Sequence, residues 1–264
     1  MAEETKDNFT EQSSGLLMKA YDDLVHPSAK SLGNTLSFLP RAIGVWLSSL
    51  EKWIINGEEA IRLTAQTVKE KASKIPEEKL VEPKPYVVVP AIQQLSYCYN
   101  SKELRRLYSN LLISAMNADT HDEVHPAFVD IIRQLSPLEA QALNKIHTLG
   151  PAITMIDIKL NYGLMNYKEI CMNYSIDLYP VFKSAYVMAS SIQNIARLGL
   201  IELCHGKVMA GEHIYEVYDE EPILAEVNEL YGADEVFVNY EKGYIKLTDF
   251  GILFCRICCD EENT

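Results

Sequence analysis

Four prolines, at positions 76, 83, 85 and 90, interrupt a chain of 264 residues whose other patterns are mostly helical. Proline lacks the backbone N–H that an interior helical residue donates, and its ring clashes with the preceding turn. The spacing therefore predicts that residues 75–90 form a linker and that the segment from Pro85 to Pro90 is extended. Three regions follow from this division: an N-terminal amphipathic helical region (1–82), a central helical region (83–135) and a C-terminal region (136–264).

The N-terminal region carries one wide apolar stripe at helical spacing, which includes Trp46 and Trp53. Such a stripe is typical of a buried face that packs against other helices. A groove for a partner and a membrane-surface face are the alternatives, and both tryptophans are interaction candidates. Arg41 and Lys52 are too few basic residues for a strongly basic membrane-binding helix.

The central region and the start of the next one have clear helix boundaries. Asn100-Ser-Lys-Glu103 resembles a capping box and precedes a strongly amphipathic run that ends near Met116. A short helix is expected over residues 124–135. Ser136-Pro-Leu-Glu139 has the form of a second capping box, whose helix should stop at Gly150-Pro151.

Helices mixed with short strands are expected after residue 151. A helix ending at Gly199 precedes one strand at 200–203, and a second strand at 244–247 precedes a last helix that runs through Cys259. This order predicts a winged-helix-like α+β domain with an enlarged acidic wing at 207–241, including a helix over Pro222–Tyr231. The predicted fold class is thus mainly α, with helical N-terminal and central regions and this C-terminal domain.

The charge of the chain is concentrated near its C-terminus. The sequence has 37 acidic and 24 basic residues, a net charge of −13. Residues 200–264 hold 15 of those acids and 4 of the bases, so −11 belongs to this segment and −2 to residues 1–199. An acidic surface of this kind favours a basic protein partner, with association that weakens in salt.

The same acidity argues against nucleic acid as the partner, because DNA-binding domains carry a basic footprint. The candidate recognition helix, from Lys183 to Arg197, has only those two charges. Asp219, Glu220 and Glu221 in the wing would repel phosphate groups. We therefore expect these three acids to contact protein, in a winged helix that does not read DNA.

Two residue sets have spacings that suit a metal ion. His121 and His125 lie four residues apart, but the order of the intervening acids matches neither common zinc-protease motif, so a loop with His125 as a helix cap is favoured. Cys255 and Cys258 form one CxxC, for which Cys204 and His205 are weak candidates as further ligands. Buried, reduced thiols are the preferred interpretation, and no metal is expected.

Known catalytic and cofactor motifs are missing from the sequence. Gly206 and Gly211 have the spacing of a phosphate-binding loop, but Glu212 replaces the lysine that such a loop requires. No GxG fingerprint and no GxSxG elbow occurs. The acidic start predicts no secretory signal, and no segment has the roughly 20 apolar residues of a membrane span. We expect a cytoplasmic protein without a cofactor and without enzymatic activity.

Three groups of motifs resemble the Abi-alpha family of bacterial abortive-infection proteins. They are Leu111-Leu-Ile-Ser-Ala-Met116 with Val124-His-Pro-Ala-Phe-Val129, then Gln134-Leu-Ser-Pro-Leu-Glu-Ala140, and finally Ser191-Ile-Gln-Asn-Ile-Ala-Arg-Leu-Gly-Leu-Ile201 with Leu247-Thr-Asp-Phe-Gly-Ile-Leu-Phe254. The resemblance covers most of residues 85–260. It implies a bacterial cytoplasmic protein of phage defence and carries over no catalytic residue.

These observations lead to one function and two alternatives. We expect a non-enzymatic phage-defence protein that acts through protein–protein contacts. A membrane-acting effector that uses the N-terminal helices is the first alternative, and a winged-helix DNA-binding regulator is the second. The sequence leaves the cellular target, the phage trigger and the oligomeric state open.

Overall fold

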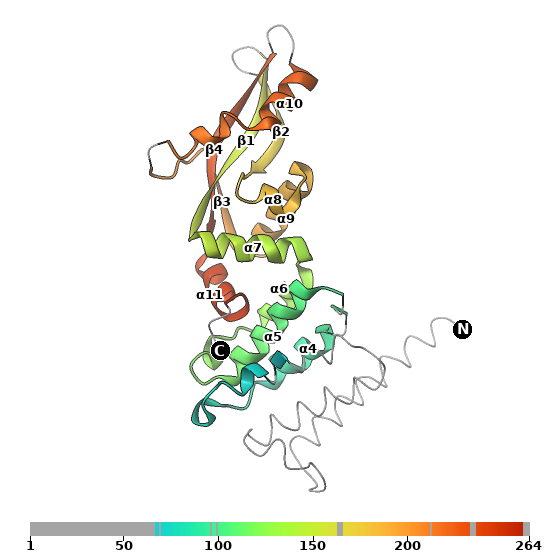
Figure 1. Cartoon of the computed structure of the whole chain (residues 1–264), viewed down its shortest axis with the longest axis vertical. Coiled ribbons are helices and arrows are strands. Elements are labelled where there is room, and N and C mark those ends of the chain that lie inside the picture. The colour runs from blue at the N-terminus through green and yellow to red at the C-terminus, as the bar shows by residue number, and fades with distance from the viewer. Residues whose placement is uncertain are drawn as a thin grey trace, which may run out of the picture. The chain divides into compact units, whose positions relative to one another are not determined.

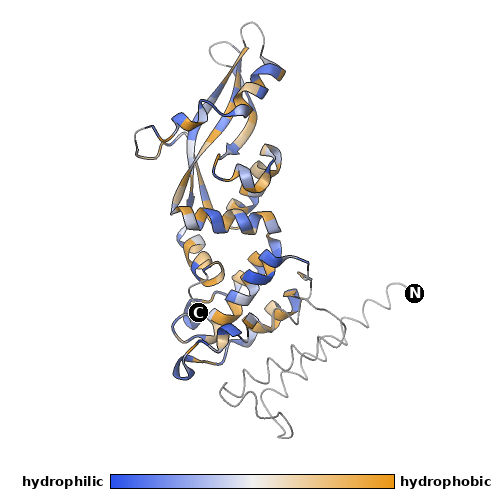
Figure 2. Cartoon of the chain, viewed as in Figure 1, coloured by the Kyte–Doolittle hydropathy of each residue, from blue (hydrophilic) through white to orange (hydrophobic). Residues whose placement is uncertain are grey.

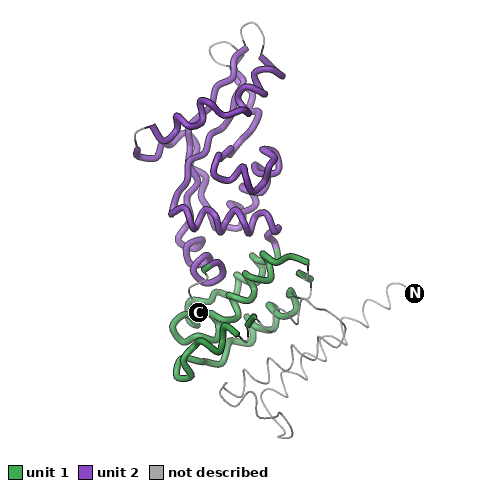
Figure 3. The backbone as a smooth tube through the Cα atoms, in the orientation of Figure 1, with its two compact units in different colours: residues 1–133, 260–264 green, residues 134–259 purple. Residues whose placement is uncertain are grey.

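A computed structural model describes residues 67–260, apart from 69, 96, 99, 163–165, 212 and 233–235. The described chain divides into two compact units, residues 1–133 with 260–264 and residues 134–259 (Figure 3). Hydrophilic and hydrophobic residues alternate along the helices and strands of both units (Figure 2), as expected for elements that bury one side. The stripe containing Trp46 and Trp53 lies outside the described residues.

The first unit is helical in its described part (Figure 1). Its elements are η1 (Glu77–Lys79), α4 (Pro85–Leu95), α5 (Lys102–Met116), η2 (His121–Glu123) and α6 (Ala127–Gln134), whose last residue begins the second unit. Helix α5 begins one residue later than the predicted capping box implies, because Ser101 rather than Asn100 is the cap and its side chain accepts a hydrogen bond from the Leu104 backbone N–H. Leu107, Tyr108 and Leu111 are fully buried on its apolar side.

The prediction that Pro85–Pro90 is extended is wrong, because this segment forms the first half of α4. Pro85 occupies the first turn, where the missing N–H has no intrahelical partner in any case. Pro90 lies inside the helix and removes one hydrogen bond. The buried residues Val87, Val88, Ala91, Ile92 and Leu95 recur at helical spacing, and their burial outweighs that loss.

The second unit contains a four-stranded antiparallel sheet with helices around it (Figure 1). Its elements are α7 (Pro137–Leu149), β1 (Ala152–Tyr162), β2 (Asn166–Tyr174), α8 (Tyr179–Phe182), α9 (Ala185–Arg197), β3 (Ile201–His205), η3 (Glu216–Tyr218), α10 (Pro222–Tyr231), β4 (Val236–Leu247) and α11 (Asp249–Cys258). The strand order is β2-β1-β4-β3. The pairing of β1 with β2 is irregular between Ile156 and Lys159, and such bulges bend and twist a strand.

This sheet overturns the predicted fold class, which was mainly α with a winged-helix-like domain. The chain is a mixed α/β protein, in which β1 pairs with β4 over the whole length from Ala152 to Tyr162. The two strands expected at 200–203 and 244–247 exist, but they are the edge strand β3 and the end of the long strand β4. The β1–β2 hairpin, which occupies one side of the sheet, was missed.

Several helix boundaries in this unit were predicted correctly. Helix α7 begins with the capping box of Ser136 and Glu139 and ends before Gly150. Helix α10 covers the predicted residues Pro222–Tyr231, and Thr248 caps α11. A Cβ atom on Gly251 would lie 1.9 Å from the Leu200 carbonyl oxygen, so the first turn of α11 can approach this backbone only with glycine.

Candidate functional site

The acidic segment before α10 is fastened to the sheet by tyrosines. Tyr215 and Tyr218 are buried, whereas their neighbours Glu216 and Val217 are exposed. The Tyr215 hydroxyl donates to the Gly243 carbonyl oxygen at 2.7 Å, and the Tyr218 hydroxyl donates to the Thr154 carbonyl oxygen at 3.0 Å. The segment therefore has a fixed position on β1 and β4.

Two of the three predicted interaction acids also have tyrosine partners. The Tyr174 hydroxyl donates to Glu221 Oε2 at 2.7 Å, and the Tyr240 hydroxyl donates to Asp219 Oδ1. Burial, together with the bond to Glu221, raises the pKa of Tyr174 far above its usual value. Burial and then Asp219 raise the pKa of Tyr240 to about 12. Asp219 and Glu221 thus hold the segment in place, while Glu220 is exposed to solvent.

Helix α10, which follows this segment in the sequence, carries further exposed acids together with exposed apolar residues. Val227 is buried, but Leu230 and Tyr231 in the last turn are 72% and 49% exposed. Glu226 and Glu229 on the same helix are exposed. We call Glu216, Val217, Asp219, Glu220, Glu226, Glu229, Leu230 and Tyr231 the acidic face. It combines negative charge with large apolar side chains, a composition suited to protein contact.

A histidine–aspartate pair joins two non-adjacent strands of the sheet. His205 Nδ1 at the end of β3 lies 2.6 Å from Asp157 Oδ2 on β1. The Asp157 side chain is 2% exposed and the His205 side chain 39%. Asp157 Oδ1 accepts a second hydrogen bond from the Asn173 backbone N–H at 2.8 Å. A buried carboxylate beside Nδ1 fixes the orientation of the imidazole ring.

Glycine at position 243 allows this pair to form. Gly243 on β4 lies between its register partners Met155 on β1 and His205 on β3. A Cβ atom there would lie 2.9 Å from the Met155 Cε atom and 3.0 Å from the Cys204 carbonyl oxygen. A larger residue would displace the flexible end of the Met155 side chain and crowd the Cys204 carbonyl oxygen. We interpret the pair as a cross-sheet clamp, a role that sequence reasoning missed when it considered His205 only as a metal ligand.

The cysteine candidates are placed in two different elements. Cys204 is buried on β3, where its thiol contacts Glu202 Oε1 at 3.5 Å, whereas Cys255 and Cys258 are buried in α11. Burial raises the pKa of Cys258 well above its usual value, which keeps this thiol protonated. Among the described residues, no three His, Cys, Asp or Glu side chains are grouped as metal ligands.

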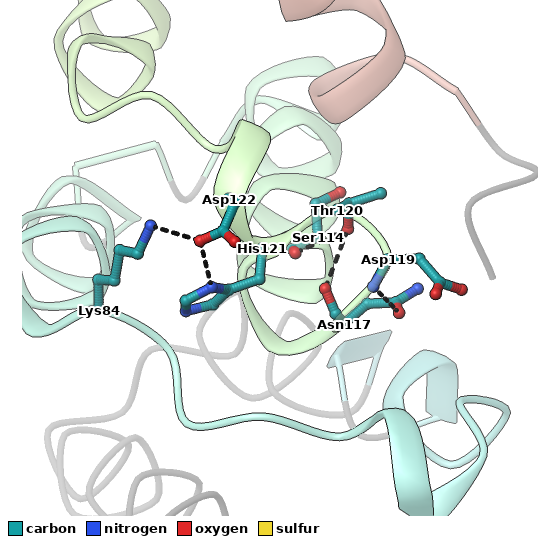
Figure 4. Close-up of polar contacts among 7 residues, drawn as sticks. All are labelled: Lys84, Ser114, Asn117, Asp119, Thr120, His121 and Asp122. Carbon is teal, nitrogen blue, oxygen red and sulfur yellow. Dashed lines mark hydrogen bonds and ion pairs between the residues drawn. The ribbon is translucent and has the colours of Figure 1, made fainter.

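A second polar cluster lies in the first unit, in the loop that follows α5 (Figure 4). The Thr120 hydroxyl donates to the Ser114 carbonyl oxygen at 2.8 Å, and Asn117 Oδ1 accepts from the Asp119 backbone N–H at 3.0 Å. Lys79 pairs with Asp119 at 2.7 Å. The loop is therefore held by its own side chains and by one lysine from η1.

The same loop contains the first histidine of the predicted metal spacing. Lys84 Nζ and His121 Nδ1 both lie 3.2 Å from Asp122 Oδ1, and these contacts, with Lys84 first, lower the pKa of Asp122 (Figure 4). His121 Nε2 is buried and has no hydrogen-bond partner. His125 instead accepts a hydrogen bond from the Ala127 N–H at 3.1 Å, as the predicted cap of α6. His121 begins η2, whereas His125 lies in the loop between η2 and α6, so the two histidines do not share one helical turn.

The predicted recognition helix, Lys183 to Arg197, corresponds to α9. Its Ser184 cap accepts a hydrogen bond from the Val187 N–H. Arg197, at its other end, donates to Gln134 Oε1 at 3.0 Å and to Asn194 Oδ1 at 2.8 Å. This guanidinium group is engaged within the unit.

Comparison with protein families gives the class of this chain. A family model described as abortive infection alpha matches residues 56–258, which include nearly all of the described elements. The chain therefore belongs to the Abi-alpha family, and this membership links it to abortive infection, the response by which infected cells block a phage. No curated protein and no solved structure matches the chain.

Within the part of the chain that is described, no helix has both the length and the apolar character needed to cross a bilayer.

Proposed function

We propose that this protein acts in abortive infection without catalysing a reaction, by binding another cytoplasmic protein through its acidic face. The observation that carries the proposal is the anchoring of this face. Tyrosine hydrogen bonds hold Asp219 and Glu221 on the sheet, so the exposed acids beside them have defined positions. A preorganised surface loses less conformational entropy on binding than a flexible loop.

The charge of this region determines which partners it can attract. Between Lys207 and Lys242 the sequence has ten acidic residues and no lysine or arginine. A basic protein surface would be attracted over about a Debye length, roughly 8 Å at physiological salt, and an acidic surface would be repelled. The partner that we propose is therefore basic.

Plating efficiency of phage tests this function. Cells with the chain should form fewer plaques than cells without it. The triple variant Glu220→Gln, Glu226→Gln, Glu229→Gln removes three exposed charges and should weaken protection. The matched control, Glu77→Gln, Glu78→Gln, Glu82→Gln, removes three exposed charges from the first unit and should protect like the wild type.

Two results would contradict the proposal. Equal protection by the acidic-face variant and the wild type would show that these charges are not used. Equal loss in both triple variants would show that only the total charge matters. Soluble expression and an unchanged circular dichroism spectrum of each variant serve as the folding control.

A further inference from the structure

The last turn of α10 exposes an apolar extension of a stripe whose earlier members contact the sheet. Ile223, Val227, Leu230 and Tyr231 recur at intervals of three and four residues along α10. Val227 is 6% exposed, whereas Leu230 is 72% exposed. The buried part of this stripe faces β4, against which α10 packs. Two neighbouring large apolar side chains in solvent are a larger exposure than a single scattered residue.

Acidic side chains border this apolar extension. Glu226 lies one helical turn before Leu230, and Glu229 directly precedes it. Both carboxylates are exposed. The sequence between Lys207 and Lys242 contains no lysine or arginine. An occupant of this site must therefore provide apolar atoms at its centre and positive charge at its edge.

The start of α10 is fixed, which keeps the exposed turn in a defined position. Glu221 precedes the helix and accepts the Tyr174 hydrogen bond, and Pro222 begins the first turn. A tyrosine on a rigid helix is suited to be a binding hot spot, because tyrosine is enriched among such residues and loses little side-chain entropy on contact.

We infer that Leu230 and Tyr231 are the anchoring contacts for a basic amphipathic helix of a partner protein. Apolar residues of that helix, spaced at three and four, would cover the two side chains, and its lysines or arginines would pair with Glu226 and Glu229. This inference rests on the proposed function and adds the residues and the chemistry of the contact. Charge complementarity selects this occupant over a second copy of the chain, whose acidic face would be repelled.

A designed peptide can test the contact without knowledge of the natural partner. The probe is an 18-residue fluorescent helix with leucines on one face and lysines on the other, titrated with the full chain and followed by anisotropy. Leu230→Ser with Tyr231→Ser keeps every charge and should weaken binding at least about tenfold, the effect of losing a hot spot. The matched control, Leu149→Ser with Tyr97→Ser, removes another exposed leucine and tyrosine, 51% and 74% exposed, and should bind like the wild type.

Two further variants separate charge from apolar contact. Glu226→Gln with Glu229→Gln should lower the affinity and flatten its dependence on salt. A second peptide with the same composition but a scrambled order, which has no apolar face, should bind the wild type and the Leu230/Tyr231 variant equally. The inference would be overturned if the amphipathic peptide bound the wild type and the Leu230/Tyr231 variant equally. It would also be overturned if sedimentation showed a changed oligomeric state of the Leu230/Tyr231 variant.

Plating efficiency of the Leu230→Ser, Tyr231→Ser variant distinguishes failure of the inferred contact from failure of the proposed defence function. If the wild type protects and the variant protects equally, the contact is wrong although the defence role stands. If the wild type itself gives no protection, the defence role fails, and the peptide titration alone then decides whether the surface binds basic helices.

Discussion

Replacing Asp157 by alanine and, separately, by asparagine would show what the cross-sheet clamp contributes. Alanine removes the acceptor of the Asn173 N–H, which lies 2.8 Å from Asp157 Oδ1. A buried donor without a partner costs about 1–3 kcal/mol. The lost bond to His205, a side chain that is 39% exposed, adds about 1 kcal/mol or less, because solvent screens it. Removal of a buried charge offsets part of this sum, so we expect a net loss of about 2 kcal/mol.

Asparagine should cost much less, about 1 kcal/mol or below. Its carbonyl oxygen can still accept from the Asn173 N–H, and its amide can donate to His205 Nδ1 once the ring takes the other neutral tautomer. Both hydrogen bonds then survive without the charge. A buried pair replaced by a neutral pair of similar shape is often close to neutral in stability.

Hydrogen exchange followed by mass spectrometry is the suitable assay, because it measures the opening of β1 and β4 separately from that of the other elements. Peptides from β1 and β4 should exchange about thirtyfold faster in Asp157→Ala, the factor that corresponds to 2 kcal/mol. Glu169→Ala, at an exposed position of β2, is the control and should change the rates little. Equal acceleration in the alanine and asparagine variants would refute the reasoning, since it would assign the effect to the charge alone.

Three other predictions follow from single contacts. Gly251→Ala should destabilise the second unit by more than about 3 kcal/mol, because its Cβ would lie 1.9 Å from the Leu200 carbonyl oxygen; Ile252→Ala, at an exposed neighbour, should cost far less in urea unfolding. Tyr240 has a raised pKa of about 12, so its neutral form is favoured in the folded state, and its contribution is complete below pH 10 and lost as the pH rises through 12. Tyr240→Phe should therefore flatten the fall of stability over this interval, and unchanged steepness would exclude the contact as a cause. Ser136→Ala should cost about 1 kcal/mol, seen as faster exchange in the first turn of α7, and a Thr variant should restore protection.

Local sequence signals predicted most of the helices correctly. The capping residues Ser101, Ser136 and Thr248 each begin a helix, because a side-chain oxygen satisfies backbone N–H groups that have no partner in the first turn. These interactions span three residues, so they can be read from a short stretch of sequence. Helix α10 could also be predicted from the sequence, because Pro222 marks its first turn.

The sheet was harder to predict, because long-range packing hides its pattern. Strand β1 buries residues on both faces near Ile156 and Ile158, so the alternation that marks a half-exposed strand is lost there. Its partner β4 lies more than 70 residues later in the sequence. The clamp of Asp157 and His205 depends on this pairing and on Gly243, and no spacing in the sequence indicates it. The contacts of Glu221 and Asp219 with tyrosines could not be predicted for the same reason, since Tyr174 lies on β2 and Tyr240 on β4.

The division of the chain at residues 133 and 259 also has a consequence for biosynthesis. The first unit is discontinuous in sequence, and Asn110 Nδ2 donates to the Asp260 carbonyl oxygen at 3.2 Å. Asn110 leaves the ribosome long before this acceptor has been translated. At a synthesis rate of roughly 5–20 residues per second, the intervening 150 positions delay the contact by about 8–30 seconds. The second unit is therefore translated in full before the ribosome reaches residue 260, where the last part of the first unit begins.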